Sequence, residues 1–428
     1  MKWLNFFQFI FSLQVDRKNY KFIKEKSLLI AILIINLILR LGIFMINYYV
    51  DPSRILAADS CDYDNSAKAL LYLGKFSVSP DKPDSPQLVR TPGYPFFIAL
   101  IYAIFGEKYF PVITIQIFLN VLTILLTYLL AKKLWGFRVA LLSTILLSLD
   151  FTTFTYSQML LTETLFTFFL LIAVTRGIYL ILSNQKYIKN ALLLGSFSAL
   201  ATLVRPISYY LIYPILIFFI VARVYCCKIW RKTLFKLFLI ILPWIILIGG
   251  WQLRNFYVSG SFDFSYIEAV DLLFYRGAEI IAIKDGISRQ EAREKIIQSL
   301  PKLENWSEAM RYRYFKKEGL SLILQHPFIY TKVMLKSIFL LLIAPADTEF
   351  LAYLGIKDRN EKVGPLRDLL RLPLKNYIKK WIAKRTLEFI VFLFAIFYLI
   401  TLYITATYSL YKISTGQKEQ ILQQYLSL

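Results

Sequence analysis

The sequence has few of the residues on which metal and nucleophilic catalysis usually depend. It holds one histidine, His326, and three cysteines in 428 residues. A single histidine excludes HExxH zinc proteases, zinc sites with several histidines and the two-histidine iron triad, and it disfavours a Ser-His-Asp mechanism. Cys61 lies far along the chain from the adjacent Cys226-Cys227, which rarely bridge, so no disulfide framework is expected. The chemistry must therefore rest on carboxylates, arginine, lysine or tyrosine.

Charged residues are also scarce. They make up 18% of the chain, against about 25% in typical soluble proteins, whereas apolar residues reach 57% against about 45–50%. With a mean hydropathy of +0.54, these values exclude a soluble globular enzyme, a disordered chain and a collagen-like fibre. The formal net charge is +22. In a membrane protein such an excess gathers on the cytoplasmic side and near anionic headgroups, so it does not indicate nucleic-acid binding. A lipid-linked anionic substrate stays open.

Repeated apolar runs of about 20 residues, the length that crosses a bilayer core, predict an all-α, polytopic membrane helix bundle. The first run, 28–48, follows a basic stretch and is too long for a cleaved signal peptide, so we interpret it as a retained helix with a cytoplasmic N-terminus. Further spans are expected at 111–131, 139–156, 160–182, 190–204, 207–223, 234–251 and 386–412.

A shorter apolar segment, 328–344, is ambiguous. If it crosses the membrane the chain has nine spans, and if it lies along the surface the chain has eight and a cytoplasmic C-terminus. Lys332 and Lys336 favour eight, because a lysine at the bilayer centre costs about 2.5–3.5 kcal/mol.

Basic residues in the short loops set the orientation. Loops near 132–138, 186–189 and 223–236 carry ten of them, while the opposite loops carry only Arg205, and basic loops stay in the cytoplasm. The predicted organisation is a cytoplasmic N-terminus at 1–27, a transmembrane bundle at 28–251 that includes an extracytoplasmic loop at 49–110, an outer helical and interfacial region at 252–345, and a C-terminal loop with the last span at 346–428.

The first outer loop carries the strongest chemical signal. Asp59, Asp62 and Asp64 cluster there, and Asp59 and Tyr63 share one face of a predicted helix. Further on, Arg90–Pro95 opens an apolar stretch that is too short to span and suits an interfacial helix. The alternative is a solvated loop with a capped helix and a Pro-Gly turn. Paired carboxylates and an arginine just outside the bilayer suit a base that acts beside a lipid phosphate.

Other charged residues stand where apolar spans leave the membrane. Glu163 opens a very apolar span, and Arg205 ends another on the same side. Glu163 is a functional candidate or a carboxylate favoured by the helix dipole. Arg205 pairs with Glu163 or a substrate phosphate, or reaches out to the interface. Arg254 marks a further exit, and Arg40, inside the first span, is read as structural or lipid-facing. His326 before Pro327 is expected to be a helix cap.

Six motifs, taken in their order along the chain, are typical of one family of membrane enzymes. They are Asp59-x3-Tyr63-x3-Ala67, Arg90-Thr-Pro-Gly-Tyr-Pro95, Leu161-Thr-Glu163, Arg205-Pro206, Pro243-Trp244 followed by Arg254-Asn255 and Gly260, and His326-Pro327-x2-Tyr330. The chain resembles the polytopic GT-C glycosyltransferases that use polyprenyl-phosphate sugars. Within them it is most similar to the bacterial mannosyl/galacturonosyltransferase-like branch, related to aminoarabinose transferase and the protein O-mannosyltransferases.

The resemblance implies inverting transfer of a sugar from a polyprenyl-phosphate donor to an extracytoplasmic acceptor hydroxyl. It implies Asp59 as the general base, with Asp62 as the fallback because Ser60 follows Asp59 where many relatives carry a second acid. Arg90 and Arg205 are expected to bind the donor phosphate. Tyr63, Tyr94, Glu163 and Arg254 are expected to line the substrate cavity. No metal or cofactor is expected, since the lipid-linked sugar is a substrate. The acceptor is expected to be a glycan, a lipid or a protein. The protein is expected to lie in the plasma or inner membrane.

Two other functions compete with this interpretation. A transporter or flippase for a lipid-linked saccharide would share the cavity and the lipid substrate, but it would more often show internal repeats, and none is evident. A transporter would also not need Asp59 beside Arg90. The second alternative is a non-catalytic membrane scaffold or assembly factor descended from the enzyme, and the intact Asp59, Arg90 and Glu163 argue against it.

Overall fold

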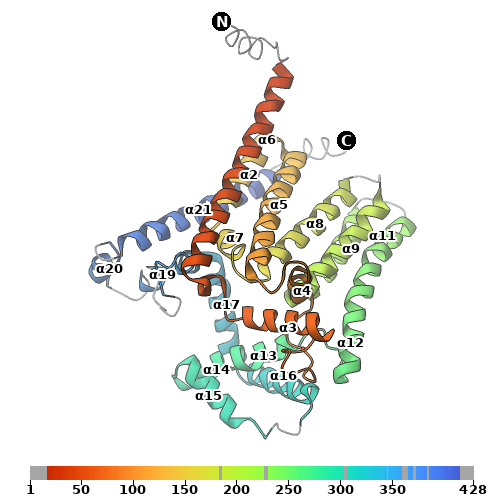
Figure 1. Ribbon diagram of the computed structural model, residues 1–428, viewed down its shortest axis with the longest axis vertical. Helices are drawn as coiled ribbons and strands as arrows, with labels where there is room; N and C mark the ends of the chain where they lie inside the picture. The colour runs from red at the N-terminus through yellow and green to blue at the C-terminus, as the bar shows by residue number, and fades with distance from the viewer. Residues whose placement is uncertain are drawn as a thin grey trace.

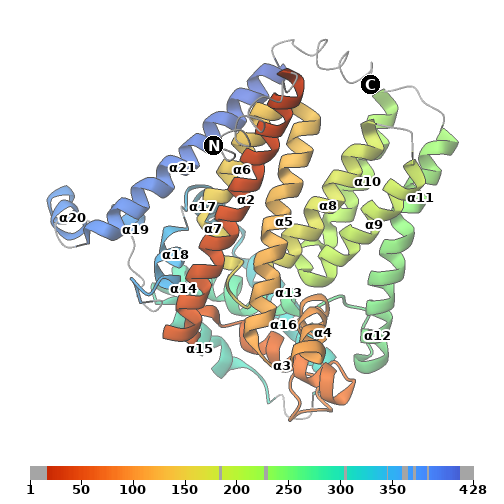
Figure 2. The ribbon, with the colours of Figure 1, turned by 45° about the horizontal axis from the view of Figure 1, so that its top comes forward.

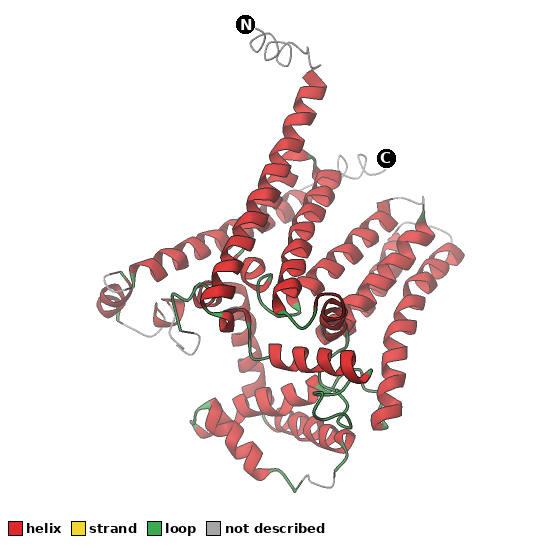
Figure 3. Ribbon diagram, viewed as in Figure 1, coloured by secondary structure: helices red, strands yellow, loops and turns green. Residues whose placement is uncertain are grey.

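The computed structural model describes residues 17–182, 186–225, 230–302, 306–344, 346–358, 365–369, 373–382 and 385–414. Within these ranges the regular structure is helical, apart from one isolated β-bridge between Ser77 and Pro86 (Figure 3). This confirms the predicted all-α bundle. The adjacent cysteines, residues 1–16 of the predicted N-terminal region and residues 415–428 of the C-terminal region lie outside the described residues.

Six of the described helices are long and apolar enough to cross a membrane, or seven if one bent pair counts as a span. The six lie within α2 (Arg17–Val50), α5 (Tyr109–Trp135), α8 (Glu163–Leu182), α9 (Tyr187–Val204), the run from α11 (Trp230–Trp244) through η3 (Ile245–Gly249) to α12 (Gly250–Ser259), and α21 (Thr386–Ser414). The bundle is polytopic, as predicted, but by this measure it has fewer spans than the eight or nine expected.

The expected span at 139–156 is divided at Asp150. The chain forms α6 (Phe137–Leu149) and then α7 (Phe151–Tyr156). Asp150 has an extended backbone, and its carboxylate accepts a hydrogen bond of 2.7 Å from the backbone N–H of Thr153. A carboxylate in this position caps a new helix instead of continuing the old one.

Arg40 of α2 is fully buried against this break. Its Nη1 donates to the Ser157 hydroxyl at 3.2 Å and to the Thr153 carbonyl at 3.4 Å, and its guanidinium lies 4.7 Å from the centre of the Phe154 ring. The described geometry therefore favours the structural alternative for Arg40.

The expected span at 207–223 is also built from two pieces. Pro206 opens η2 (Pro206–Leu211), and α10 (Ile212–Tyr225) follows. Proline fits the first turn of a helix because its missing N–H has no partner there in any case. The turn ends α9 at Arg205, which has an extended backbone.

The segment 328–344 forms α17 (Pro327–Ile343). It bends by 99° from α16 (Glu308–Gln325) at His326, so the two helices together make a broken span or a re-entrant loop. His326 caps the end of α16 and precedes the first residue of α17, as expected. Beyond it, α21 rises from α20 (Leu374–Trp381) toward the end of the bundle where α2 begins (Figures 1 and 2).

A layer of short helices covers the opposite end of the bundle (Figure 1). It consists of α3 (Ser60–Leu73), α4 (Gly93–Phe105), α13 (Ile267–Val270), the π-helical η4 (Asp271–Gly277), α14 (Ala278–Asp285), α15 (Arg289–Ser299) and α16. A buried cluster joins this layer to the spans through Tyr63, Tyr94, Ile113, Leu160 and Val204. These contacts hold the first outer loop against α5, the start of α8 and the end of α9.

Candidate functional site

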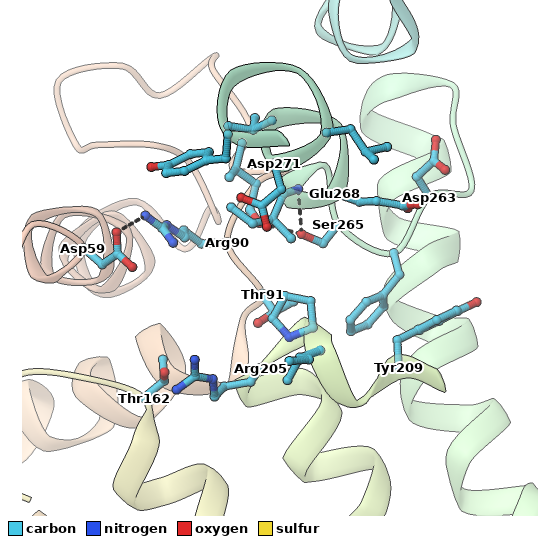
Figure 4. Close-up of a pocket in the computed structure, with 18 of the residues that line it drawn as sticks. Asp59, Arg90, Thr91, Thr162, Arg205, Tyr209, Asp263, Ser265, Glu268 and Asp271 are labelled. Carbon is cyan, nitrogen blue, oxygen red and sulfur yellow. Dashed lines mark hydrogen bonds and ion pairs between the residues drawn. The ribbon is translucent and has the colours of Figure 1, made fainter. Parts of the chain in front are cut away.

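A cavity of about 1100 Å³ lies between the helical bundle and the outer layer (Figure 4). Its lining comes from the start of α3, the segment before α4, the start of α8, the end of α9, η2 and the outer region 262–276. Individual residues of α12, α16 and α17 complete it: Gln252, Lys316, Tyr330 and Met334. Six of the predicted site residues line it: Asp59, Asp62, Tyr63, Arg90, Glu163 and Arg205. The structure thus brings together groups that lie up to about 150 residues apart in the sequence.

Arg90 holds both carboxylates of the first outer loop. Its Nη2 lies 2.7 Å from Asp59 Oδ1 and 2.9 Å from Asp62 Oδ2, and its Nε lies 3.1 Å from the same Asp62 oxygen. The guanidinium also lies 5.3 Å from the centre of the Tyr63 ring. Burial alone lowers the pKa of Arg90, but Tyr63 and the two carboxylates raise it above its ordinary value. Arg90 is therefore a fixed cation whose Nη1 has no hydrogen-bond partner among the described residues.

Asp59 is positioned by its neighbour in the sequence. The buried Ser60 hydroxyl donates to the Leu160 carbonyl at 2.8 Å and accepts from the Ala57 N–H at 2.8 Å. The Leu160 N–H in turn donates to the Ile55 carbonyl at 2.8 Å. Ser60 thus fastens the start of α3 to the loop that leads into α8.

Glu163 and Arg205 form a second ion pair on the membrane side of the cavity. Arg205 Nη1 lies 2.6 Å from Glu163 Oε1, and the Thr162 hydroxyl donates to Glu163 Oε2 at 3.2 Å. Both charged side chains are about one third exposed to the cavity. The sequence left Glu163 and a substrate phosphate as alternative partners of Arg205, and the structure shows the pair with Glu163.

The turn after Arg90 brings the two arginines to one cavity. The Thr91 hydroxyl donates to the Val204 carbonyl at 3.2 Å. Gly93 packs against the same segment so closely that an added Cβ would lie 2.7 Å from the carbonyl carbon of Leu203. A glycine is therefore required where α4 begins, because any side chain would push α4 away from the end of α9.

Replacing Gly93 by alanine is expected to lower the free energy of unfolding by about 1–3 kcal/mol, the usual cost of overpacking a close contact. The measurement is thermal unfolding of the purified protein in detergent. Gly250→Ala is the matched control, since a Cβ added there meets nothing within 4 Å. Equal stability of the two variants would contradict the close approach of α4 and α9.

Two predicted cavity residues lie elsewhere. Tyr94 is fully buried behind the wall, where its hydroxyl donates to Gln116 Oε1. Gln116 Nε2 donates to the Met159 carbonyl at 2.8 Å, so Tyr94 supports the loop before Glu163. Arg254 donates to the carbonyls of Gln87 at 3.1 Å and Phe76 at 2.7 Å, and it therefore ties α12 to the connector of the first outer loop. Neither side chain is part of the lining, in contrast to the expectation.

The third aspartate of the cluster also has a packing role. Asp64 is buried and accepts hydrogen bonds from the hydroxyls of Tyr102 at 2.7 Å and Tyr109 at 3.0 Å. Lys68 lies 2.8 Å from the same carboxylate. Asp64 thus fastens α3 to α4 and α5 and does not face the cavity.

The sequence analysis missed the outer wall of the cavity. Asp263, Glu268, Asp271, Arg276 and Lys316 line it from the side opposite the bundle. Burial raises the pKa of Asp271, with Arg276 and Arg90 acting against that shift and Asp59 adding to it. The signal in the sequence was a pair of charges, Asp271 and Arg276, inside an otherwise apolar helical segment.

One comparison with known proteins found a match for part of the chain. Residues 84–247 match the family model of the dolichyl-phosphate-mannose-protein mannosyltransferases. The match confirms the resemblance to the GT-C glycosyltransferases and supports a membrane glycosyltransferase of that type. The matched segment contains Arg90, Glu163 and Arg205, while Asp59 and Asp62 precede it. No curated protein and no solved structure matches this chain.

Proposed function

We propose that this protein transfers a sugar from a polyprenyl-phosphate donor to an acceptor hydroxyl outside the cytoplasm, with inversion at the anomeric carbon. The observation that carries the proposal is the convergence of Asp59, Arg90, Glu163 and Arg205 on one cavity at the end of the membrane spans. The family match over the segment that holds three of these residues supports it. We place the protein in the plasma or inner membrane, with its N-terminus in the cytoplasm.

Asp59 is the proposed general base. Its contact with Arg90 uses Oδ1, which leaves Oδ2 to accept the proton of an acceptor hydroxyl. As the hydroxyl oxygen attacks the anomeric carbon, its proton passes to Asp59. The new glycosidic bond forms while the bond from the anomeric carbon to the phosphate oxygen breaks, and polyprenyl phosphate leaves. A positioned base of this kind contributes about 10²–10⁴-fold to the rate.

The two arginines are the proposed phosphate ligands. Negative charge grows on the phosphate oxygen as the bond breaks, and preorganised cations stabilise that charge. In the part of the chain that the structure describes, Arg90 has Nη1 available beyond its two carboxylates. Arg205 uses Nη1 for Glu163 and has its other nitrogens available there. The planar guanidinium suits phosphate oxygens better than a lysine would.

The test is transfer by the purified protein from a panel of polyprenyl-phosphate sugars, beginning with mannose and including a pentose donor. We expect release of polyprenyl phosphate that depends on an acceptor and persists in the presence of EDTA. Binding of the donors without release from any of them would favour the transporter or scaffold interpretation. If release occurs without EDTA and is lost when EDTA is added, the protein is still a transferase, but its expected independence from metal is wrong.

A further inference from the structure

The outer wall of the cavity faces the two ion pairs across an open space. Figure 4 shows Asp271 and Glu268 on one side and Arg205 and Thr91 on the other, with the contact between Asp59 and Arg90 at one end. Lys316 Nζ lies 3.1 Å from Glu268 Oε2, so these two side chains of the wall form an ion pair. Among the described residues the Asp271 carboxylate makes no hydrogen bond or ion pair, although it lines the cavity. It is the carboxylate of this wall that is free to take a ligand.

The position of Asp271 is built into the fold. It begins η4, a π-helical turn, and such turns are frequent at functional sites. The wall is fastened to the segment before Arg90, because the Tyr266 N–H donates to the Leu88 carbonyl at 2.9 Å and the Ser265 hydroxyl donates to the Val89 carbonyl at 2.6 Å.

Close packing fixes the other side of the turn. Gly319 of α16 lies so near η4 that an added Cβ would be 2.7 Å from the carbonyl carbon of Leu272. Tyr275 stands one turn after Asp271, half exposed, with the Arg293 guanidinium 4.2 Å from the centre of its ring. The wall thus presents a carboxylate and an aromatic ring in a fixed arrangement.

The charges of the cavity limit what this wall can accept. The lining has six carboxylates and four cationic side chains, an excess of two negative charges: Asp59, Asp62, Glu163, Asp263, Glu268 and Asp271 against Arg90, Arg205, Arg276 and Lys316. Three of the cations are already paired with carboxylates. A donor phosphate adds further negative charge. Like charges in a partly dehydrated site repel strongly, so a second anionic group is disfavoured.

We propose that the outer wall binds the acceptor and that the acceptor is an uncharged carbohydrate, an inference that rests on the proposed function. Carboxylate oxygens accept hydrogen bonds from sugar hydroxyls, and guanidinium groups donate to them. The Tyr275 ring covers an apolar face of a sugar while its hydroxyl stays polar. The described part of this wall consists of helices and offers no sheet edge on which an extended peptide could pair its backbone.

The first experiment measures binding without turnover. A neutral disaccharide on a short alkyl chain is titrated into the wild-type protein and into Asp271→Asn by isothermal calorimetry. We expect the variant to bind at least about tenfold more weakly, the loss typical of a hydrogen bond to a charged group. Asp285→Asn is the matched control, because Asp285 pairs with Lys295 on the outer surface and is not part of the lining. Equal affinity of Asp271→Asn and wild type would overturn the site.

The second experiment tests the class of acceptor. The disaccharide, its phosphorylated form and a Ser/Thr-rich peptide are compared by release of polyprenyl phosphate. We expect the highest kcat/KM for the neutral sugar and at least a tenfold lower value for the phosphorylated one. A higher kcat/KM for the peptide would overturn the carbohydrate assignment. Tight binding of the disaccharide that depends on Asp271, with no release from any donor, would support the site and contradict the proposed transferase.

Discussion

Replacement of Asp59 by asparagine is expected to lower kcat for sugar transfer by about 10²–10⁴-fold. Asparagine has the same shape but cannot take up the proton of the acceptor hydroxyl. The Asp59 side chain is 51% exposed, so the change leaves no buried group without a partner and the protein is expected to fold. The measurement is steady-state release of polyprenyl phosphate at saturating donor and acceptor, with size-exclusion profile and thermal stability as checks on folding.

The matched control for this prediction is Asp62→Asn. Asp62 is the other carboxylate partner of Arg90 and is exposed to a similar extent, 49%. Its replacement removes the same charge from the same arginine, so it reports how much of the loss comes from electrostatics and how much from proton transfer. We expect a loss clearly smaller than that of Asp59→Asn. The reverse order would make Asp62 the base, and full activity of both variants would exclude a base in this loop.

The parts of the site that the sequence predicted best are those whose partners are marked by local context. Glu163 and Arg205 are isolated charges at the ends of apolar spans, and the cost of such charges in a membrane makes them natural partners. Arg90 and Asp59 belong to one loop, where a single helix, Ser60–Leu73, and one connector limit the distance between them. In both cases the predicted topology already put the two partners of the ion pair on the same side of the membrane, and the structure shows them in contact.

The outer wall was not predictable in the same way. Its register against the first outer loop depends on a backbone hydrogen bond between Tyr266 and Leu88, two residues that lie far apart in the chain and carry no sequence signal. For Tyr94 the sequence did carry a signal, but the signal pointed to the wrong environment. Its motif suggested the cavity, but the Gly93 contact turns α4 so that Tyr94 points into the core toward Gln116. Tertiary packing decided both outcomes, since local pattern cannot report which face of a short helix becomes buried.

Replacement of Arg90 by alanine is expected to weaken binding of the donor by about 10–100-fold. Hydrogen bonds to charged groups contribute about 1.5–3 kcal/mol, and each 1.4 kcal/mol is tenfold in affinity. The variant also leaves Asp59 and Asp62 without their shared cation, so an incoming phosphate meets two carboxylates. Equilibrium binding of polyprenyl phosphate alone is the measurement, because it reports the phosphate contact without chemistry.

Arg90→Lys separates charge from geometry in this experiment. Lysine keeps the positive charge but lacks the planar fork that reaches both carboxylates and a phosphate together. We expect its affinity to fall between those of wild type and Arg90→Ala. A purely structural Arg90, which only fastens the segment before α4 to α3, predicts a different pattern: thermal stability falls in both variants while the folded protein binds polyprenyl phosphate normally. Because the side chain is only 16% exposed, stability and affinity must be measured together, and the ratio of the two losses decides between the roles.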